Sequence, residues 1–415
     1  MTTTTTRPTR PADAFDAPSA DARRGLAARI SLGRVFAPVP VEFLLIASTA
    51  LLLTTFGLVM ILSATSATTP SAPLETVMKQ GVFAMIGIPL MLIGSRMPVA
   101  FWKRIAWPAL IVATVLQLLV FTPLGHTFDG NRNWIVVAGV QAQPAEFLKL
   151  ALALWLGFVL YRKQTLLGLW RHVYIPVVPV AAAVIATVMA GNDLGTAMIL
   201  TLVVLGALFF SGVRLRVFIL PLLAGIGFVA FYAVKSPDRM RRILSFMDTS
   251  CLDTYYSDCY QPLHGIWALA GGGLFGLGLG NSKEKYGWLP AASSDYVFAI
   301  VGEELGLIGC AVLLTLFAIF AVGVFHIIRK TNDPFVRIVS GGIVIWIVGQ
   351  ALINIAVVLR LFPVLGIPLP FVSQGGTSLL SVLMATGVLL SFARTLPRRE
   401  AVPQRQPARS RAAAR

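Results

Sequence analysis

The sequence predicts an all-α, polytopic membrane protein with ten transmembrane helices, on the basis of its composition and the length of its apolar runs. Of 415 residues, 56% are hydrophobic and 13% are charged, and the mean hydropathy is +0.79. Soluble domains carry about 25% charged residues. Apolar runs of about 20 residues are long enough to cross, as helices, a hydrocarbon core about 30 Å thick. A transmembrane barrel is not expected, because it would show short alternating segments instead.

Apolar runs bounded by charged or turn-forming residues give the expected spans. They are residues 43–63, 78–93, 105–124, 147–161, 173–190, 196–212, 217–234, 297–328, 339–358 and 378–392.

Positive charges between the spans predict the orientation of the chain. If the N-terminus is cytoplasmic, alternate loops should be rich in Lys and Arg. They contain Arg96, Lys103, Arg104, Arg162, Lys163, Arg171, Arg214, Arg216, Arg329, Lys330 and Arg337. Both termini are therefore expected in the cytoplasm. We expect a disordered basic tail at 1–41, one membrane domain at 42–394 and a second basic tail at 395–415.

The net charge of +16 is explained by this topology. Nucleic-acid binding is not expected, because the sequence contains neither a basic patch interleaved with aromatic residues nor a known reader motif.

Three long segments are predicted on the extracytoplasmic face, at 125–144, 235–296 and 360–376. The second connects the seventh and eighth spans. Structureless loops of this length are uncommon unless they are functional. Any chemistry is therefore expected outside the membrane.

Basic residues in the 235–296 loop flank a glycine-rich apolar stretch at 271–280. They include Arg239, Arg242, Lys283 and Lys285. Cations beside an apolar patch can hold the phosphates of a lipid headgroup, and unselective anchoring to the lipid surface is the alternative. The glycines match a dinucleotide-binding fingerprint, but no strand precedes them, and close backbone packing is the favoured explanation.

Two cysteines of the same loop, Cys251 and Cys259, are candidates for a disulfide, since the extracytoplasmic side permits oxidation. Cys310 lies inside a span. No Cys and His cluster has the spacing of a zinc site, so no metal ligands are expected.

Three acidic or basic residues stand where spans enter the membrane. Glu146 and Lys149 are three residues apart, which places them on one helix face. A structural ion pair is favoured over direct substrate contact, because buried charges are normally paired. Asp295 stands where the polar loop enters an apolar run. Its spacing allows either a helix cap or a general base.

Several long motifs occur in a specific order along the chain. They are DGNRNW at 129–134, QPAEFLK at 143–149, DLGTA at 193–197, GLGLGNSKEKYGWLP at 276–290, SSDYVFAIVGEELG at 293–306 and FPVLGIPLPFVSQGGTS at 362–378. Together they resemble the SEDS family of cell-wall glycosyltransferases, whose members also have ten spans. The resemblance covers nearly the whole chain between the tails. The GNSKEKYG motif is more similar to the division branch of the family than to the elongation branch.

The resemblance implies polymerisation of lipid II, the undecaprenyl-diphosphate disaccharide-pentapeptide, into glycan strands outside a bacterial cell membrane. Asp295 matches the family's essential outer-loop Asp and is implied to be the general base. The residues implied to bind substrate are Arg132, Lys149, Arg239, Arg242, Lys283, Lys285, Asn354 and Ser373.

The same resemblance implies partners and a location. A class B penicillin-binding transpeptidase, other division proteins and membrane lipid are the expected partners, and the division septum is the expected site. A divalent cation, Mg²⁺ or Mn²⁺, is a candidate cofactor, although no residues specify its site.

The sequence also departs from the family pattern. Family members usually have a His just before the Asp, where this chain has Ser293 and Ser294. Asn192 replaces a usual Pro, and Gln374 replaces a usual Tyr. These substitutions affect the expected positioning of Asp295 more than the expected activity. Two other functions stay open, a lipid II flippase and a non-catalytic scaffold that activates its transpeptidase.

Overall fold

The computed structural model describes residues 39–397, apart from 67–73, 129, 138, 236, 248–254 and 257. The two predicted tails lie almost entirely outside these residues. The helices are α1 (Val41–Thr65), α2 (Glu75–Gly94), α3 (Val99–Leu118), α4 (Pro144–Arg162), α5 (Trp170–Met189), α6 (Leu194–Ser211), α7 (Leu215–Lys235), α8 (Pro237–Met247), α9 (Tyr260–Gly272), α10 (Val297–Lys330), α11 (Pro334–Val344), α12 (Gln350–Val358) and α13 (Gly376–Ala393).

The predicted multi-pass helical fold is confirmed. Nine segments in the described residues are long and apolar enough to cross a membrane, with α11 and α12 together forming one of them. α7 coincides with the remaining predicted span, but its apolar stretch, Arg216–Tyr232, is shorter. Each predicted span thus falls on a helix, while the count of ten membrane crossings stays a prediction.

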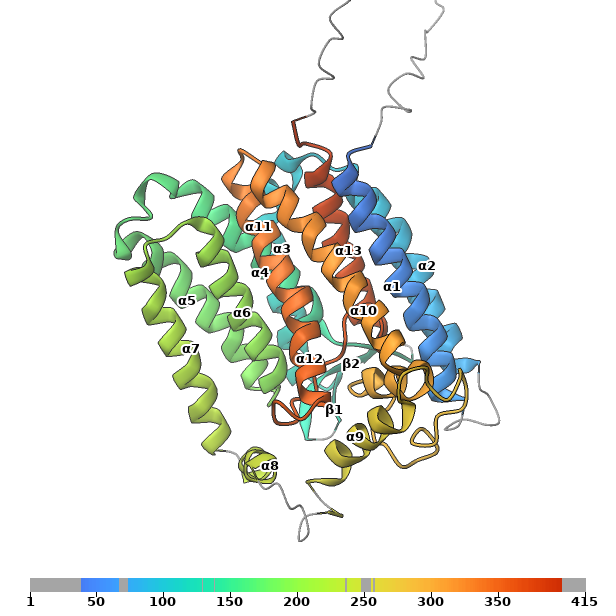
Figure 1. The fold of residues 1–415 in the computed structure, drawn as a ribbon. Helices are drawn as coiled ribbons and strands as arrows, with labels where there is room; N and C mark the ends of the chain where they lie inside the picture. Colours follow the sequence, from blue (N-terminus) through green and yellow to red (C-terminus); the bar gives the residue numbers. More distant parts are fainter. Residues whose placement is uncertain are drawn as a thin grey trace, which may run out of the picture. The chain divides into compact units, whose positions relative to one another are not determined.

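The helices form a bundle whose chain ends lie on one side. The start of α1 and the end of α13 lie at one end of the bundle, and α8, α9 and the strands lie at the other (Figure 1). α2 packs against α13, α1 against α10, and α4 and α6 against α11. The start of the first helix and the end of the last helix are therefore at the same end of the bundle.

Local sequence signals explain several helix ends. Asp193 caps α6, because its Oδ1 accepts a hydrogen bond of 2.9 Å from the Thr196 N–H. α6 ends at Gly212, which adopts a left-handed φ of +79°. Asp333 caps α11 in the same way through the Phe335 N–H at 2.9 Å, and Pro334 follows it.

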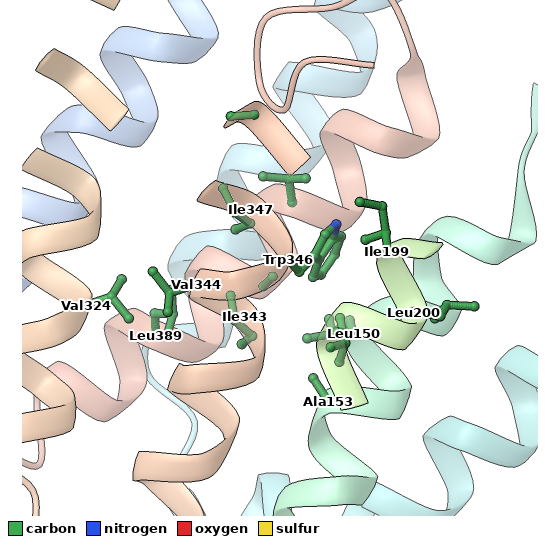
Figure 2. Close-up of a cluster of buried hydrophobic side chains, with 14 of the residues drawn as sticks. Leu150, Ala153, Ile199, Leu200, Val324, Ile343, Val344, Trp346, Ile347 and Leu389 are labelled. Carbon is green, nitrogen blue, oxygen red and sulfur yellow. The ribbon is translucent and has the colours of Figure 1, made fainter. Parts of the chain in front are cut away.

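The bundle core includes a π-helical turn at Ile345–Gly349, between α11 and α12. Figure 2 shows Val344 beside Leu389, and Trp346 facing Ile199 of α6. Trp346 is fully buried. The turn therefore joins α11 and α12 at the centre of the packed helices.

The segment 125–144 is not the irregular loop that the sequence suggests. It forms an antiparallel sheet of β1 (Gly125–Phe128), β2 (Asn131–Val137) and β3 (Val140–Ala142), in the order β1-β2-β3. The strands are so short that the alternation of apolar and polar residues along them is not visible in so apolar a chain. The last strand is followed directly by α4.

α10 is broken at Gly306, which has φ +67° and ψ −165°. At the break, backbone N–H and C=O groups of α10 lack their usual partners within the helix. The glycine-rich stretch after α9 forms hydrogen bonds with these groups. The N–H groups of Leu277 and Gly278 donate to the carbonyls of Glu303 and Glu304 at 2.9 and 3.0 Å. In return, the Leu307 N–H donates to the Gly273 carbonyl at 3.0 Å.

The glycines are needed for this contact, because a Cβ on Gly276 would overlap the Glu304 carbonyl and a Cβ on Gly306 would overlap the Gly276 amide. Close backbone packing is therefore their role here.

Candidate active site

Asp295 lies immediately before α10 and is half-buried. The N-cap of α10 is Tyr296, and its side chain makes no capping hydrogen bond. The sequence suggested that Asp295 is the cap. This is wrong by one residue, because the turn at 291–296 delays the start of the helix and leaves Asp295 just ahead of it.

Three residues from distant parts of the chain hold the backbone around Asp295. Asn354 Nδ2 donates to the Asp295 carbonyl at 2.7 Å and to the Ile367 carbonyl at 2.7 Å. Ser373 Oγ donates to the Ser294 carbonyl at 2.5 Å. The Gln374 N–H donates to the Ser293 carbonyl at 2.8 Å. The carbonyls of 293–295 are thus all fixed by α12 and the 360–376 segment.

Asn354 and Ser373 were expected to bind substrate directly. Both are buried, with exposed fractions of 1% and 5%, and substrate binding by them stays a prediction. Their polar hydrogens are directed to backbone carbonyls, so they position the loop that carries Asp295.

Ser293 and Gln374, which belong to the expected departures from the family pattern, contact each other. Ser293 Oγ donates to Gln374 Oε1 at 2.6 Å. This bond adds a side-chain link to the backbone bond between the same two residues. The two substitutions therefore form one contact beside Asp295.

The 360–376 segment also passes close to the Asp295 carboxylate. A Cβ at Gly366 would lie 3.7 Å from Asp295 Oδ2, and Gly366 has a left-handed φ of +66°. The segment therefore forms one wall of the space around the carboxylate.

Two arginines lie on another side of this site. Arg242 of α8 is exposed, and it lines a cleft together with Arg360. Burial raises the pKa of the Tyr296 hydroxyl, the Asp295 carboxylate adds to the rise, and Arg242 and Arg360 oppose it. The site therefore brings an acid and two permanent cations near one buried phenol. The side chain of Arg239 lies outside the described part of the structure, so its role stays a prediction.

Lys285 does not lie on the surface, as a phosphate-binding residue would. Its Nζ is fully buried and donates to Glu304 Oε1 at 3.0 Å and to the Gly280 carbonyl at 2.7 Å. Substrate binding by Lys285 stays a prediction. Lys285 holds the 280–285 loop against α10. Lys283 is exposed, and its backbone N–H donates to Glu303 Oε1 at 2.8 Å.

Glu303 and Glu304 hold the same loop from the broken part of α10. Ser282 Oγ donates to Glu303 Oε2 at 2.5 Å, and Ser63 Oγ of α1 lies 2.6 Å from Glu304 Oε1. The sequence did not indicate that Glu303 and Glu304 bind the loop preceding Asp295.

Glu146 and Lys149 form an ion pair inside the bundle. Lys149 Nζ lies 2.8 Å from Glu146 Oε1, and both side chains are 2% exposed. Lys149 Nζ also donates to Gln350 Oε1 at 3.1 Å, and Gln350 Nε2 donates to the Pro368 carbonyl at 2.8 Å. Substrate contact by Lys149 stays a prediction. The pair supports the segment that passes Asp295.

Arg132 is on β2 and remains exposed. Its Nε and Nη2 each donate at 3.0 Å, to the carbonyls of Val120 and Thr122 at the end of the α3 region. These bonds tie the sheet to the bundle, and substrate binding by Arg132 stays a prediction.

Asp193 also has a structural role. Its Oδ2 accepts bonds from Asn133 Nδ2 at 2.7 Å and Gln143 Nε2 at 3.0 Å, which joins β2 and the start of α4 to α6. Asn192, at φ +64°, stands where the family usually has Pro, and the proline ring does not permit that angle.

Arg360 is the site residue that sequence reasoning missed. A single Arg at the start of a mainly apolar segment carries no motif signal, and only the fold brings it near Arg242.

Two other expectations concern cysteines and metals. Cys251 lies outside the described residues, so its bridge with Cys259 stays a prediction. In the described ranges, no group of three or more His, Cys, Asp or Glu side chains is arranged to hold a metal ion. A divalent cation stays a prediction.

Comparison with known proteins places this site in a family context. The family model described as "Cell cycle protein", covering FtsW, RodA and SpoVE, matches residues 43–397. A probable peptidoglycan glycosyltransferase FtsW of Mycobacterium bovis is 36% identical over 360 residues, which cover 86% of this chain and 68% of the relative. The stage V sporulation protein E of Bacillus subtilis is 35% identical over 358 residues, covering 85% and 96%.

A solved structure shows the same fold. A chain from a study of the structural coordination of polymerization and crosslinking by a peptidoglycan synthase complex has a TM-score of 0.67 and 23% identity. The match covers 85% of this chain and 96% of that chain. The matched motifs, the helical fold and the near-complete coverage lead to one conclusion: the chain belongs to the FtsW/RodA/SpoVE family of cell cycle proteins.

Proposed function

We propose that this protein is a peptidoglycan glycosyltransferase that polymerises lipid II into glycan strands at the outer surface of the cell membrane. The observation that carries the proposal is the half-buried Asp295 carboxylate, on a loop whose three consecutive carbonyls, at 293–295, are fixed by hydrogen bonds. The names of the relatives support the reaction class.

In the proposed mechanism Asp295 is the general base. Its carboxylate takes the proton from the acceptor hydroxyl as that oxygen attacks the anomeric carbon of the donor sugar. The new β-1,4 bond forms with inversion, while the bond to the lipid diphosphate breaks. A base must lie within hydrogen-bonding reach of the proton that it removes, and a rigid loop satisfies that requirement better than a mobile one.

The leaving lipid diphosphate gains negative charge that cations can stabilise. Arg242 is exposed, and its charge acts on Tyr296, the residue after Asp295. Lys283 is also exposed, on the 280–285 loop. Arg239 and Arg132 remain candidates of the same kind.

We also propose that the protein acts at the division septum with a class B penicillin-binding transpeptidase. The study that reports the structural relative describes polymerization and crosslinking in one synthase complex, which supports a partner of this kind.

A lipid II flippase would need polar groups along a path through the membrane. Glu146, Lys149, Gln350 and Ser381 do lie inside the bundle, but they bond to one another and are closed from solvent. They form a structural cluster, and the polymerase is favoured.

The test uses the full-length protein with its cognate transpeptidase and labelled lipid II. Wild type should produce glycan polymer, and Asp295→Asn should fold but produce none. Equal polymer from both would refute the catalytic assignment. If neither makes polymer, transfer of labelled lipid II across vesicles would identify a flippase, and stimulation of the transpeptidase alone would identify a scaffold.

A further inference from the structure

The glycine-rich stretch after α9, residues 273–280, exposes large apolar side chains. Leu274, Phe275, Leu277 and Leu279 are between 38% and 79% exposed. The chain from 265 to 282 contains no Asp, Glu, Lys or Arg. Apolar patches of this kind are rare on surfaces that face only water, and they mark contact with a membrane or with another protein.

This apolar stretch adjoins the exposed side of a helix that is apolar enough to cross a membrane. The Leu307 N–H of α10 donates to the Gly273 carbonyl at 3.0 Å, and the Ile308 N–H donates to the Leu274 carbonyl at 3.3 Å. Leu307 and Ile308 are themselves 61% and 51% exposed. The stretch and the exposed side of α10 therefore form one continuous apolar surface.

The length of α10 indicates the depth of this surface in a membrane. α10 ends with Arg329 and Lys330, and basic residues at a helix end mark one boundary of the bilayer. Gly306 is 24 positions before Lys330, which is about 36 Å at 1.5 Å per residue. The hydrocarbon core is about 30 Å thick, and the bilayer with its headgroups is about 40–45 Å thick. The level of Gly306 therefore falls in the opposite interface, between acyl chains and water.

The backbone of the stretch fits an interface better than the hydrocarbon core. Irregular backbone exposed to lipid is not tolerated in the core, because its polar groups would have no partners. Four backbone hydrogen bonds with α10, through the N–H groups of 277 and 278 and the carbonyls of 273 and 274, satisfy part of the stretch. The remaining groups need water, which the interface supplies.

Two exposed tryptophans flank the stretch. Trp267 of α9 precedes it and Trp288 follows it, and their rings lie 4.8 and 6.0 Å from the ring of His264. Tryptophan is enriched where a membrane meets water, because its ring is apolar and its N–H is polar. Lys283 is the first charged residue after the stretch and is exposed. A cation beside an apolar patch suits the phosphates of lipid headgroups.

We propose that residues 273–280 form a wedge in the lipid interface, with Phe275 and Leu279 among the acyl chains and the two tryptophans at the level of the headgroups. The leaflet is the one at the start of α10, which is the outer leaflet in the proposed orientation. Lipid is favoured over a partner protein, because the patch continues the exposed side of a spanning helix and is flanked by interfacial tryptophans. The inference does not depend on the catalytic assignment.

Spin labelling of the full-length protein in phosphatidylcholine nanodiscs tests this depth. Single labels are placed at Phe275→Cys or Leu279→Cys in a Cys310→Ala background, which removes a free buried thiol, and the background signal is subtracted. Thr127→Cys on the exposed polar strand β1 is the water control, and Val312→Cys, further along α10, is the lipid control. The ratio of oxygen to nickel-chelate collision rates at 275 should be several-fold higher than at 127 and lower than at 312.

Two results would overturn the proposal. A nickel-chelate collision rate at 275 and 279 equal to that at 127 would place the stretch in water. Low collision rates with both reagents would show that protein covers the stretch, for example a second copy of this chain. Melting temperatures are measured on the same samples, and the label at 279 provides the same test if Phe275→Cys does not fold.

A charged variant tests insertion by a second route. Phe275→Asp places a charge among the acyl chains, which is costly. It should therefore raise the nickel-chelate collision rate of a label at Leu279→Cys several-fold. Phe128→Asp is the matched control, since it charges an exposed phenylalanine of β1 and should leave the label at 279 unchanged. An unchanged collision rate in Phe275→Asp would refute the wedge.

Discussion

Ser293 Oγ donates a 2.6 Å hydrogen bond to Gln374 Oε1, and the Gln374 N–H donates back to the Ser293 carbonyl. This double link joins the loop of Asp295 to the segment before α13. Both positions depart from the expected family pattern, and the structure brings them into contact. The pair is a positioning device for Asp295, two residues away.

Ser293→Ala and Gln374→Ala should each lower kcat for polymerisation with little change in KM. One hydrogen bond contributes about 1 kcal/mol, which corresponds to roughly a fivefold change in rate. Because both variants break the same bond, Ser293→Ala/Gln374→Ala should be no slower than the slower single variant. Steady-state kinetics of the four proteins checks this, and fully multiplied effects would show that the two side chains act separately.

Lys149→Ala should destabilise the protein strongly. It leaves Glu146 as a buried charge without its cation and removes the bond to Gln350, a loss of about 3–5 kcal/mol. Thermal unfolding in detergent measures the effect. Lys79→Ala is the control, because its pair with Glu75 is exposed and should matter little. Equal melting temperatures for Lys149→Ala and wild type would contradict the ion-pair role.

Gly276→Ala should be more destabilising than Gly280→Ala. Both glycines have a left-handed φ, +80° and +85°, so alanine adds similar backbone strain at each. Only at Gly276 does a Cβ overlap the Glu304 carbonyl, and such overpacking typically costs about 1–3 kcal/mol. The difference in melting temperature measures the contact between the glycine-rich stretch and α10. Identical losses at the two positions would argue against it.

The helices and their order could be predicted from sequence because long apolar runs and loop charges report membrane crossings directly. The i, i+3 spacing likewise placed Glu146 and Lys149 on one face. The positions of Lys285 and Arg360 could not be predicted in this way. Both depend on contacts between segments far apart in the chain, Lys285 with Glu304 and Ser63, and Arg360 with Ser245. A basic residue in an outer loop has the same local pattern whether the fold buries it or exposes it.

The cysteine prediction can be tested by mass spectrometry. A bridge between Cys251 and Cys259 closes a short loop. On the entropic model it should stabilise the folded protein by about 2.5 kcal/mol, because it restricts the unfolded chain. Alkylation of denatured protein without reductant should therefore leave the 251–259 peptide unmodified. Cys310 is a free, buried cysteine and should be alkylated in the same sample as a positive control. Two alkyl groups on the 251–259 peptide would exclude the bridge.

The central claim is that the Asp295 carboxylate removes the acceptor proton. Its most direct test is the polymerisation rate of Asp295→Asn at saturating lipid II, with binding and melting temperature measured on the same preparation. General-base catalysis contributes roughly 100-fold or more to rate. The account predicts a loss of at least that size with lipid II binding and folding retained. A rate within a few fold of wild type would contradict it.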